Sequence, residues 1–548
     1  MSYTKPGVEV TQLQSSVSAN LIPPDLLSVM VGPGYHVAEI TDNPDSTFMD
    51  SYYQTYDKDS GNTITVSGLT SDWPTIDQNS VYVDLIGGTT ANAGVVAHLV
   101  KGSDFDTTVS GVVLYTAASG LNITDAFDGA EIKIGYRARK TNLNKFLSIE
   151  SPDEVQSRVG LITTINPLAQ ALSVALTAAN KTVYGYGTVA SDDSTHASAL
   201  SYLSAKEVYA LIPLSHTSAV LTNYKDHVNF YSRPEQKKHR ITIQNKKLAW
   251  TDADGVTEGD YATGYASALT NGSIGSTAQQ LKANALAYGE RRVFWTLPDV
   301  VYIRERRHIS TLKQAYLDAC NHIDSAGLAL GLNAILATTI TMADGTKYYA
   351  GEELTDTLWA IIKEEYTYLT CLIPVPGYYL AAIVGGQISA YDPSQPFTNI
   401  SIPSISLIKY SNDVFSETQL NTIAEGGNYI FVQSTDSSPI ICRHQLSTDM
   451  SSVERRELSI TKTLDFCSKF LTNTLSPYIG KYNITPRTMK ILAMTFSALS
   501  TYLVREGHVN ECKLEKLEQD EIQKDSIIVT VRVGVMYPIN YIRITLIF

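Results

Sequence analysis

The final segment of the chain places the strongest constraint on its fold. It reads "VTVRVGVMYPINYIRITLIF" (residues 529–548), and apolar and polar side chains alternate on both sides of Pro538. Alternation with a period of two predicts β-strands. The apolar side chains of the two strands are Val529, Val531, Val533 and Val535, then Ile542, Ile544, Leu546 and Phe548. An apolar strand left unpaired promotes aggregation, so this tail needs a sheet to join.

Length and composition indicate a large globular protein. A chain of 548 residues exceeds one ordinary core, so we expect two to four domains. The hydrophobic content of 44% is sufficient to bury them. Because the net charge is -13 and charged residues make up only 18%, the composition argues against a phosphate-binding surface, and we expect no nucleic-acid partner.

The cysteines and the N-terminal residues suggest folding in a cytoplasm. No CxxC motif is present, so we expect neither a zinc site nor a disulfide framework, but buried, reduced thiols. The five cysteines are Cys320, Cys371, Cys442, Cys467 and Cys512. The start "MSYTKPGVEV" lacks a signal-peptide pattern, and no run of 18 apolar residues occurs, so direct membrane insertion is not expected.

The pattern of the sequence changes several times, which predicts a multidomain α+β protein with a mixed α/β core. Short alternating runs separated by Gly, Asp and Asn predict a β-rich domain inserted at 42–148. Alternating strand and helix patterns predict an α/β domain around it. The expected division is an N-terminal arm at 1–20, a central α/β domain at 21–41 and 149–385, the insertion at 42–148, a C-terminal domain at 386–538 and a C-terminal arm at 539–548.

Individual elements of the α/β region can also be predicted. "LLSVMVGPG" predicts a core strand that ends in a turn at residues 32–34, and Ser151 is expected to cap a helix with Glu154 completing a capping box. The order strand, helix, strand is expected for "TVYGYGTV", "THASALSYLSA" and "EVYALIPL", and long helices are expected at 309–337.

Two helices are expected before the terminal strands. In the first, one apolar face consists of Ile460, Leu464, Cys467 and Leu471. In the second, Thr485 is the N-cap, Pro486 is the first residue and Gly507 ends the helix. The second helix is apolar over so much of its surface that we expect it to be largely covered, by its own domain or by a neighbour.

No stretch of the chain has the pattern of a catalytic, metal or cofactor site. There is no P-loop motif, and "TDADGVTEGD" lacks the Gly and Glu positions of a calcium loop, which favours a solvated turn. The histidines His216, His227 and His239 lack metal-ligand spacing and are expected to be surface or core residues. The basic run from Arg304 is expected to begin a solvated helix. An enzyme is therefore not predicted.

Several stretches, in the same order along the chain, resemble the contractile tail sheath family of bacteriophages and related injection machines. They begin with the pattern of Pro6, Gly7, Val8 and Val10. The others are "INPLAQALSVALTAANKTVYGYGT", "EVYALIPLSHTSAVLTNYKDHVNFYSRPEQKKHRI", "PVPGYYLAAIVGGQISAYDPSQPFTN", "ICRHQLSTDMSSVERRELSITKTLDF" and "VRVGVMYPINYIRITLIF".

The resemblance implies a structural function with no cofactor. Subunits of this family form stacked hexameric rings, a helical sheath around a tail tube protein, together with baseplate and tail terminator proteins. The sheath shortens and drives the tube through the host envelope for genome ejection, so the implied location is a virion tail assembled in the host cytoplasm. The insertion at 42–148 would face outward.

The resemblance also assigns residues to two kinds of contact. Each subunit would add its terminal arms to a neighbour's sheet by β-strand augmentation. The arm residues are Val8, Val10, Ile542, Ile544, Leu546 and Phe548. The tube-facing candidates are Arg487, Lys490 and Arg505 on the second C-terminal helix, with "KLEKLEQDE" from Lys513 as the second choice.

Three alternatives remain open at this point. The chain could form the sheath of a phage-like injection or secretion machine. It could also be another β-rich virion structural protein, such as a capsid or baseplate component, which would lack paired arms. An enzyme with a site assembled from residues far apart in sequence would show a buried, convergent cluster of titratable groups.

Overall fold

A computed structural model describes the chain in two compact units. Unit 1 comprises residues 1–25, 392–394 and 462–548, and unit 2 comprises residues 26–391 and 395–461. The described residues are 23–37, 50–55, 63–65, 81–86, 96–99, 105–107, 111–114, 131–136, 138–140, 143–160, 162, 166–179, 181–247, 250–252, 255–257, 274–308, 340–341, 347–348, 368–408, 415–435 and 438–546. The prediction of long helices at 309–337 lies outside these residues.

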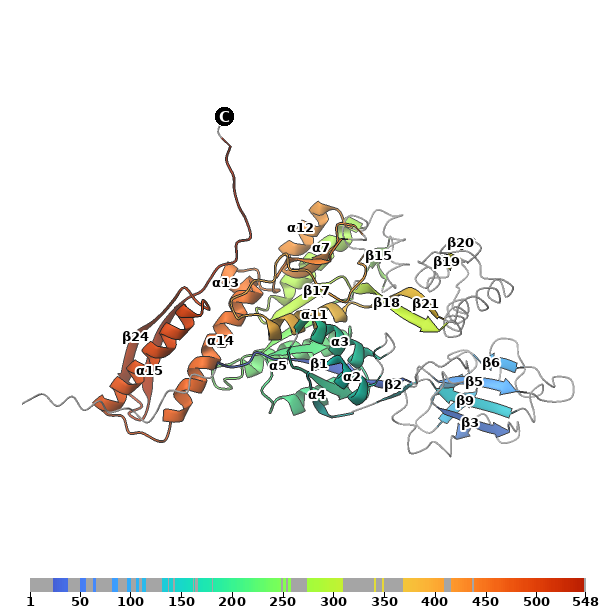
Figure 1. The fold of residues 1–548 in the computed structure, drawn as a ribbon, viewed down its shortest axis with the longest axis horizontal. Helices are drawn as coiled ribbons and strands as arrows, with labels where there is room; N and C mark the ends of the chain where they lie inside the picture. Colours follow the sequence, from blue (N-terminus) through green and yellow to red (C-terminus); the bar gives the residue numbers. More distant parts are fainter. Residues whose placement is uncertain are drawn as a thin grey trace, which may run out of the picture. The chain divides into compact units, whose positions relative to one another are not determined.

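An eight-stranded mixed sheet forms the centre of unit 2 (Figure 1). Its strands, in spatial order, are β11 (Phe146–Ile149), β12 (Val183–Thr188), β1 (Ser28–Pro33), β13 (Ala210–Pro213), β14 (Ile241–Asn245), β17 (Val293–Leu297), β22 (Asn428–Val432) and β23 (Ile441–His444). The strands from β12 to β22 are parallel, and the two outer strands are antiparallel to their neighbours. The α+β class predicted from the sequence is confirmed.

Helices cover both faces of this sheet. On one face α4 (Asp193–Leu203), α5 (Ser218–Tyr231) and α7 (Ile274–Tyr288) connect successive parallel strands. The other face carries α3 (Pro167–Ala179) and α11 (Tyr378–Ala390), which pack closely on each other. A Cβ on Gly386 would lie 2.2 Å from the carbonyl oxygen of Ala175, so the small side chains of α11 permit this contact.

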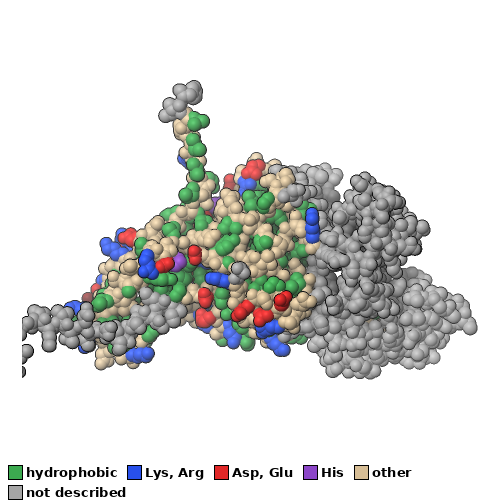
Figure 2. Space-filling model, in the orientation of Figure 1, with side chains coloured by type: hydrophobic (Ala, Val, Ile, Leu, Met, Phe, Trp, Pro, Cys, Tyr) green, Lys and Arg blue, Asp and Glu red, His purple; other side chains and the backbone are tan. Residues whose placement is uncertain are grey.

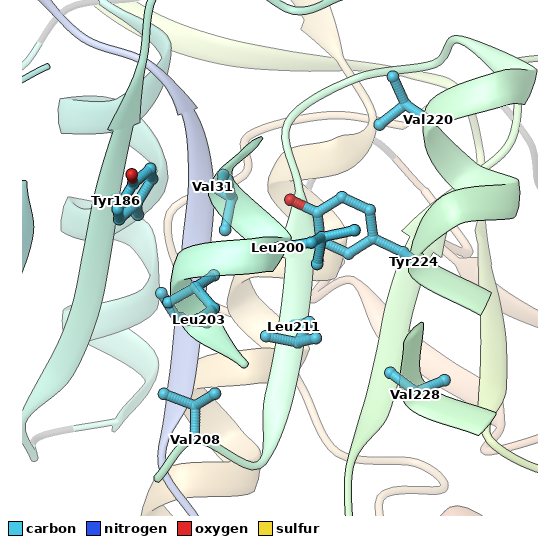
Figure 3. Close-up of a cluster of buried hydrophobic side chains, with 11 residues drawn as sticks. Val31, Tyr186, Leu200, Leu203, Val208, Leu211, Val220, Tyr224 and Val228 are labelled. Atoms are coloured by element: carbon cyan, nitrogen blue, oxygen red, sulfur yellow. The ribbon is translucent and has the colours of Figure 1, made fainter. Parts of the chain in front are cut away.

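β1 is buried on both faces because its apolar run is continuous and successive side chains of a strand point to opposite faces. Val29 and Val31 join the cluster under α4 and α5 that Figure 3 shows, whereas Met30 points to the other face, near Gly385 of α11. The predicted strand is confirmed, but the predicted turn begins too early, because β1 continues through Pro33. A Cβ on Gly32 would lie 2.6 Å from the Cβ of Leu214, so this glycine allows close strand packing.

The remaining elements of unit 2 are shorter. Within 42–148 the described regular elements are strands, as predicted. They form a four-stranded sheet of β3 (Asp50–Thr55), β9 (Glu131–Tyr136), β5 (Tyr82–Ile86) and β6 (Val96–Leu99), and a three-stranded sheet of β4 (Thr63–Thr65), β8 (Gly111–Leu114) and β7 (Phe105–Thr107). In addition, β10 (Ala138–Lys140) pairs with β2 (Tyr35–Val37), which precedes this range, and β11 of the central sheet begins at Phe146. The other elements are α2 (Pro152–Arg158), β15 (Trp250–Asp252), β16 (Gly255–Thr257), β18 (Val300–His308), β19 (Ile340–Thr341), β20 (Lys347–Tyr348), β21 (Tyr368–Pro376), α12 (Glu417–Glu425) and α13 (Val453–Arg456).

Two local predictions need correction. The basic run from Arg304 does not begin a helix, because residues 300–308 form β18 and pair along their length with β21. Buried Val301 and Ile303 fix this strand, so packing overrides the charge pattern. Ser151 caps α2 as predicted, but Glu154 Oε2 accepts from the backbone N–H of Glu150 at 2.8 Å, which is not the geometry of a capping box.

Unit 1 consists of two helices and a two-stranded sheet. They are α14 (Leu458–Leu475), whose first turn is counted with unit 2, the short 3₁₀ helix η5 (Ser476–Tyr478), α15 (Pro486–Arg505), β24 (Glu511–Gln519) and β25 (Ile527–Gly534). Both ends of α15 are as predicted: Thr485 Oγ1 accepts from the N–H of Thr488 at 3.2 Å, and Gly507 has φ +71°.

The core of unit 1 differs in part from the predicted faces. Ile460 and Cys467 of α14 are buried as expected, but Leu464 and Leu471 are only half-buried. Phe466 and Phe470 of α14 are buried instead. The centre of the Phe466 ring lies 5.0 Å from that of His508, and the centre of the Phe470 ring lies 5.3 Å from that of Tyr502. On α15 the buried apolar side chains are Leu492, Phe496, Leu499 and Leu503. The described cysteine thiols, Cys442, Cys467 and Cys512, are free and buried, as predicted, and burial raises the pKa of Cys442 and of Cys467 to about 12.

Buried His196 makes the stability of unit 2 depend on pH. Its ring lies 3.0 Å from the hydroxyl of Tyr224, and burial lowers its pKa from 6.5 to about 4. The unfolded chain therefore takes up a proton at a higher pH than the folded chain. The contribution of neutral His196 to the free energy of unfolding is complete above pH 6.5 and is lost as the pH falls towards 4.

We expect the free energy of unfolding to fall by roughly 3 kcal/mol over this range through His196 alone. Denaturant titrations at several pH values measure it. The variant His196→Gln keeps a partner for Tyr224 but removes the titrating group, so its pH slope should be smaller. Equal slopes for the two proteins would contradict the assignment to His196.

Candidate assembly interface

The C-terminal arm, of which residues 539–546 are described, has no strand partner within the part of the chain that the structure describes. After β25 ends at Gly534, the chain runs as an extended trace to the C-terminal mark (Figure 1). Figure 2 shows hydrophobic side chains along this projecting segment. Their exposed fractions are 83% for Ile539, 77% for Tyr541, 78% for Ile542, 79% for Ile544 and 84% for Leu546. The strand predicted from the alternation is thus not formed in a single copy.

Apolar side chains stand on both sides of this arm. In an extended chain Ile542, Ile544 and Leu546 share one face, and Ile539 and Tyr541 share the other. A strand of this kind is stable only when it is covered on both faces, as in a buried sheet. The arm therefore fits a partner that offers both a strand edge and an apolar layer. Phe548 lies outside the described residues.

The β24–β25 hairpin is a sheet with two open edges, as far as the described residues extend. The two strands pair with each other from Glu511 and Gly534 to Gln519 and Ile527, with an irregularity between Leu514 and Lys516. α15 packs on β24, where the hydroxyl of Ser500 donates to the carbonyl oxygen of Cys512. Open edges expose unpaired backbone N–H and C=O groups, to which a further strand can bind.

Charged side chains occupy several of the other positions on the hairpin. Arg532 Nη2 lies 2.6 Å from Glu515 Oε1, and Lys516 is paired with Glu518. Charges on an edge strand oppose unspecific pairing. The hairpin can thus stay soluble in a free subunit and still accept a strand of matching pattern.

The predicted tube-facing residues lie on one exposed stripe of α15. Arg487, Lys490 and Arg505 are all exposed, and the helical repeat brings them to the same side as Met494, which is 73% exposed. Arg505 Nη2 lies 2.7 Å from Glu506 Oε1. The opposite side of α15 packs in unit 1. The stripe is therefore free for a partner with apolar and acidic groups, but its partner remains a prediction.

The other predicted contact residues are less informative. Val8 and Val10 lie outside the described residues. The second-choice segment from Lys513 forms most of β24 and the turn that follows. Its contact with a tube stays a prediction.

The described part of the chain contains no group of three or more His, Cys, Asp or Glu side chains that could hold a metal ion. His216 Nε2 lies 2.7 Å from Asn245 Oδ1, and His227 Nε2 lies 2.6 Å from Arg240 Nη1. Burial lowers the pKa of both histidines, and Arg240 adds to the effect on His227. His216 and His227 therefore fit the prediction that these histidines are core residues. None of the described helices is both long and apolar enough to cross a lipid bilayer.

Comparison with solved structures finds matches among proteins of contractile machines. The chain is similar to contractile sheath proteins. It matches the helical sheath of the anti-feeding prophage in the contracted state with 12% identity and a TM-score of 0.46, over 74% of this chain and 88% of that one. It matches the contracted sheath complex of the PVC extracellular contractile injection system with 10% identity and a TM-score of 0.44, over 74% and 87%.

A third match covers more of the chain. The sheath tail protein from Desulfitobacterium hafniense has 8% identity and a TM-score of 0.38, over 94% of this chain and 97% of that one. No protein-family model matches the sequence, and no curated protein matches it.

The sequence did not identify two parts of this interface. The hairpin partner β24 was not predicted, because "CKLEKLEQ" has charged residues at most positions and an irregularity interrupts its period. Only its pairing with the clearly alternating β25 could have suggested it. The exposed position of Met494 was not identified either, because the sequence predicted only that its helix is largely covered, by its own domain or by a neighbour.

Proposed function

We propose that this chain is the structural subunit of a contractile tail sheath, which polymerises around a tail tube and contracts to drive the tube through a host cell envelope. The observation that carries the proposal is the C-terminal arm, whose apolar side chains are exposed on both faces in a single copy. A soluble subunit with such an arm, beside a hairpin with open edges, is suited to strand exchange between copies. The stretches that resemble the sheath family, in the same order along the chain, support the same function.

The proposed mechanism is mechanical and needs no catalytic residue. Subunits would assemble as stacked hexameric rings in a strained, extended state, with baseplate and terminator proteins at the ends. Contraction would move the subunit bodies to a second packing of lower energy, while the arms keep neighbouring copies connected. Residues 536–540, between β25 and the arm, would act as a hinge. The 42–148 insertion would lie on the outside, and the domain boundaries given above would separate it from the packing core.

Electron microscopy of the purified protein tests the proposal. The full chain, alone or with its tube protein, should form hollow cylinders with a regular axial repeat. A chain that stays monomeric at high concentration and with the tube protein would refute the function. Labelled antibodies on intact phage particles would distinguish a virion tail from an injection or secretion machine.

The α15 stripe gives a separate prediction about the tube. Charge reversal by Arg487→Glu with Lys490→Glu should weaken binding to the tube about tenfold or more, since each lost charge contact costs about 1 kcal/mol at an exposed site. Contacts between sheath subunits should persist. Co-sedimentation with the tube measures the effect, and Lys481→Glu, an exposed change off the helix, is the matched control. Unchanged co-sedimentation would exclude this stripe.

A further inference from the structure

Exposed large apolar side chains are concentrated at one edge of the central sheet. Among the residues that the structure describes in unit 2, they are Tyr202, Phe230 and Leu286, with exposed fractions of 41%, 43% and 44%. Each lies in the last turn of a crossover helix, α4, α5 or α7. Because these helices return to the amino ends of parallel strands, their C-terminal turns meet at the same edge.

The three helices form a continuous row. Asn223 of α5 donates to Asp193 of α4, and the Lys225 ammonium group of α5 lies 4.8 Å from the centre of the Tyr288 ring of α7. At the other end of α4, Lys238 Nζ and Arg240 Nη2, which follow α5, lie 2.8 Å and 3.0 Å from the carbonyl oxygens of Ser204 and Leu203. The C-terminal turns of α4 and α5 therefore adjoin on one surface.

Basic residues lie next to these apolar side chains, with exposed Glu207 and Glu235 between them. Lys206 Nζ lies 5.0 Å from the centre of the Tyr202 ring, and the Arg233 guanidinium lies 5.3 Å from that of Phe230. Lys237 is exposed in the loop after α5. We name Tyr202, Lys206, Phe230, Arg233, Lys237 and Leu286 the amino-edge patch. Exposed aromatic rings together with arginine are the composition of an interface hot spot.

The hairpin tip of unit 1 has the complementary composition. Ile522, between β24 and β25, is 90% exposed, the highest value among the large apolar side chains described. Acidic residues flank it at Asp520, Glu521 and Asp525. Asp520 Oδ1 accepts from the N–H groups of Ile522 at 2.7 Å and Gln523 at 3.1 Å, so the turn has a defined shape that presents Ile522 outward.

We propose that the hairpin tip of one copy docks on the amino-edge patch of a second copy. Ile522 packs between the exposed side chains of α4, α5 and α7, and Glu521 and Asp525 lie against Lys206, Arg233 and Lys237. Since the two surfaces differ, the contact is head-to-tail and can extend along a polymer. The inference rests on the proposed function, because it requires many copies packed side by side.

A photo-crosslinking amino acid at position 522 of the full chain tests the contact directly. Mixed polymers of ¹⁴N- and ¹⁵N-labelled subunits, irradiated and digested, should give crosslinks between copies that map to residues 199–206, 228–240 or 283–290. Crosslinks confined to other regions, or within one copy only, would overturn the contact.

Substitutions provide a second, independent measurement. Ile522→Ser should raise the concentration needed for polymerisation roughly 10- to 100-fold, as expected for the loss of one buried aliphatic side chain. Glu521→Lys and Lys237→Glu should each weaken assembly, and the two together should restore it. Ile479→Ser and Lys481→Glu alter equally exposed residues of unit 1 and serve as controls.

The outcomes separate this inference from the function. Normal cylinders from Ile522→Ser, or no rescue by the charge exchange, would refute the docking contact and leave the sheath function in place. If the wild-type protein never polymerises, the proposed function fails, and the docking contact fails with it.

Discussion

Deletion of residues 539–548 should give a soluble protein that melts cooperatively and forms no cylinders. Ile539, Tyr541, Ile542, Ile544 and Leu546 are each more than three-quarters exposed, so their removal takes nothing from the core of the subunit. In a polymer each buried side chain of this kind contributes about 1.5 to 3 kcal/mol. The deletion therefore acts on assembly and not on folding.

The length of the arm is sufficient for this role. Residues 540–546 span at most roughly 25 Å when extended. Pro538 separates them from β25, since proline cannot donate a hydrogen bond to a sheet. The arm can thus leave its own hairpin and reach an adjacent copy.

Point substitutions refine this experiment. Ile542→Ser, Ile544→Ser and Leu546→Ser, combined, keep the length of the arm and should abolish cylinders in the same way. Arg543→Ser changes the opposite face and should leave assembly nearly unchanged. Sedimentation and electron microscopy measure polymer formation, and thermal unfolding measures the fold. Cylinders from the truncated protein, or a misfolded truncated chain, would contradict an intersubunit arm.

Patterns that act locally were predicted correctly from the sequence. The N-cap at Thr485 and the end at Gly507 follow from backbone chemistry within a few residues, and α15 has both. The strand at β1 was clear for a similar reason, since its apolar run is continuous. Its end was placed too early, because the tight contact between Gly32 and Leu214 depends on a distant part of the chain.

Patterns that depend on a distant partner were predicted less well. The basic run from Arg304 forms a strand because β21, more than sixty residues later, offers a partner along its length. Charged residues such as Lys516 and Glu518 similarly remove the strand pattern from the sequence of β24, which forms a strand because it pairs with β25. The arm is the most informative case: its alternation was plain in the sequence, but the strand needs a partner that a single copy does not supply.

The largest effect on stability is expected from Arg240→Met. Arg240 is fully buried, and its guanidinium donates to the carbonyl oxygens of Leu203 at 3.0 Å and Lys206 at 2.5 Å. It also lies 2.6 Å from His227 Nε2. One side chain thus ties the end of α4 to α5 and to the start of β14. The guanidinium carbon of Arg240 also lies 5.1 Å from the centre of the Tyr231 ring.

Methionine preserves much of the volume of Arg240 and none of its donors. The Leu203 carbonyl keeps the backbone N–H of Lys206 as a donor, whereas the Lys206 carbonyl and His227 Nε2 lose theirs. Each buried polar group left without a partner costs about 1 to 3 kcal/mol, so the free energy of unfolding should fall by about 3 to 5 kcal/mol. The pKa of His227, which burial and Arg240 hold at about 3, should rise in the variant, because the neighbouring positive charge is gone. Denaturant unfolding measures the first effect and histidine NMR titration the second.

Arg233→Met, seven residues earlier and exposed, is the matched control and should change stability by less than about 0.5 kcal/mol. An Arg240→Met protein as stable as this control would show that the carbonyl groups find other donors, and the proposed tie between α4, α5 and β14 would then be wrong.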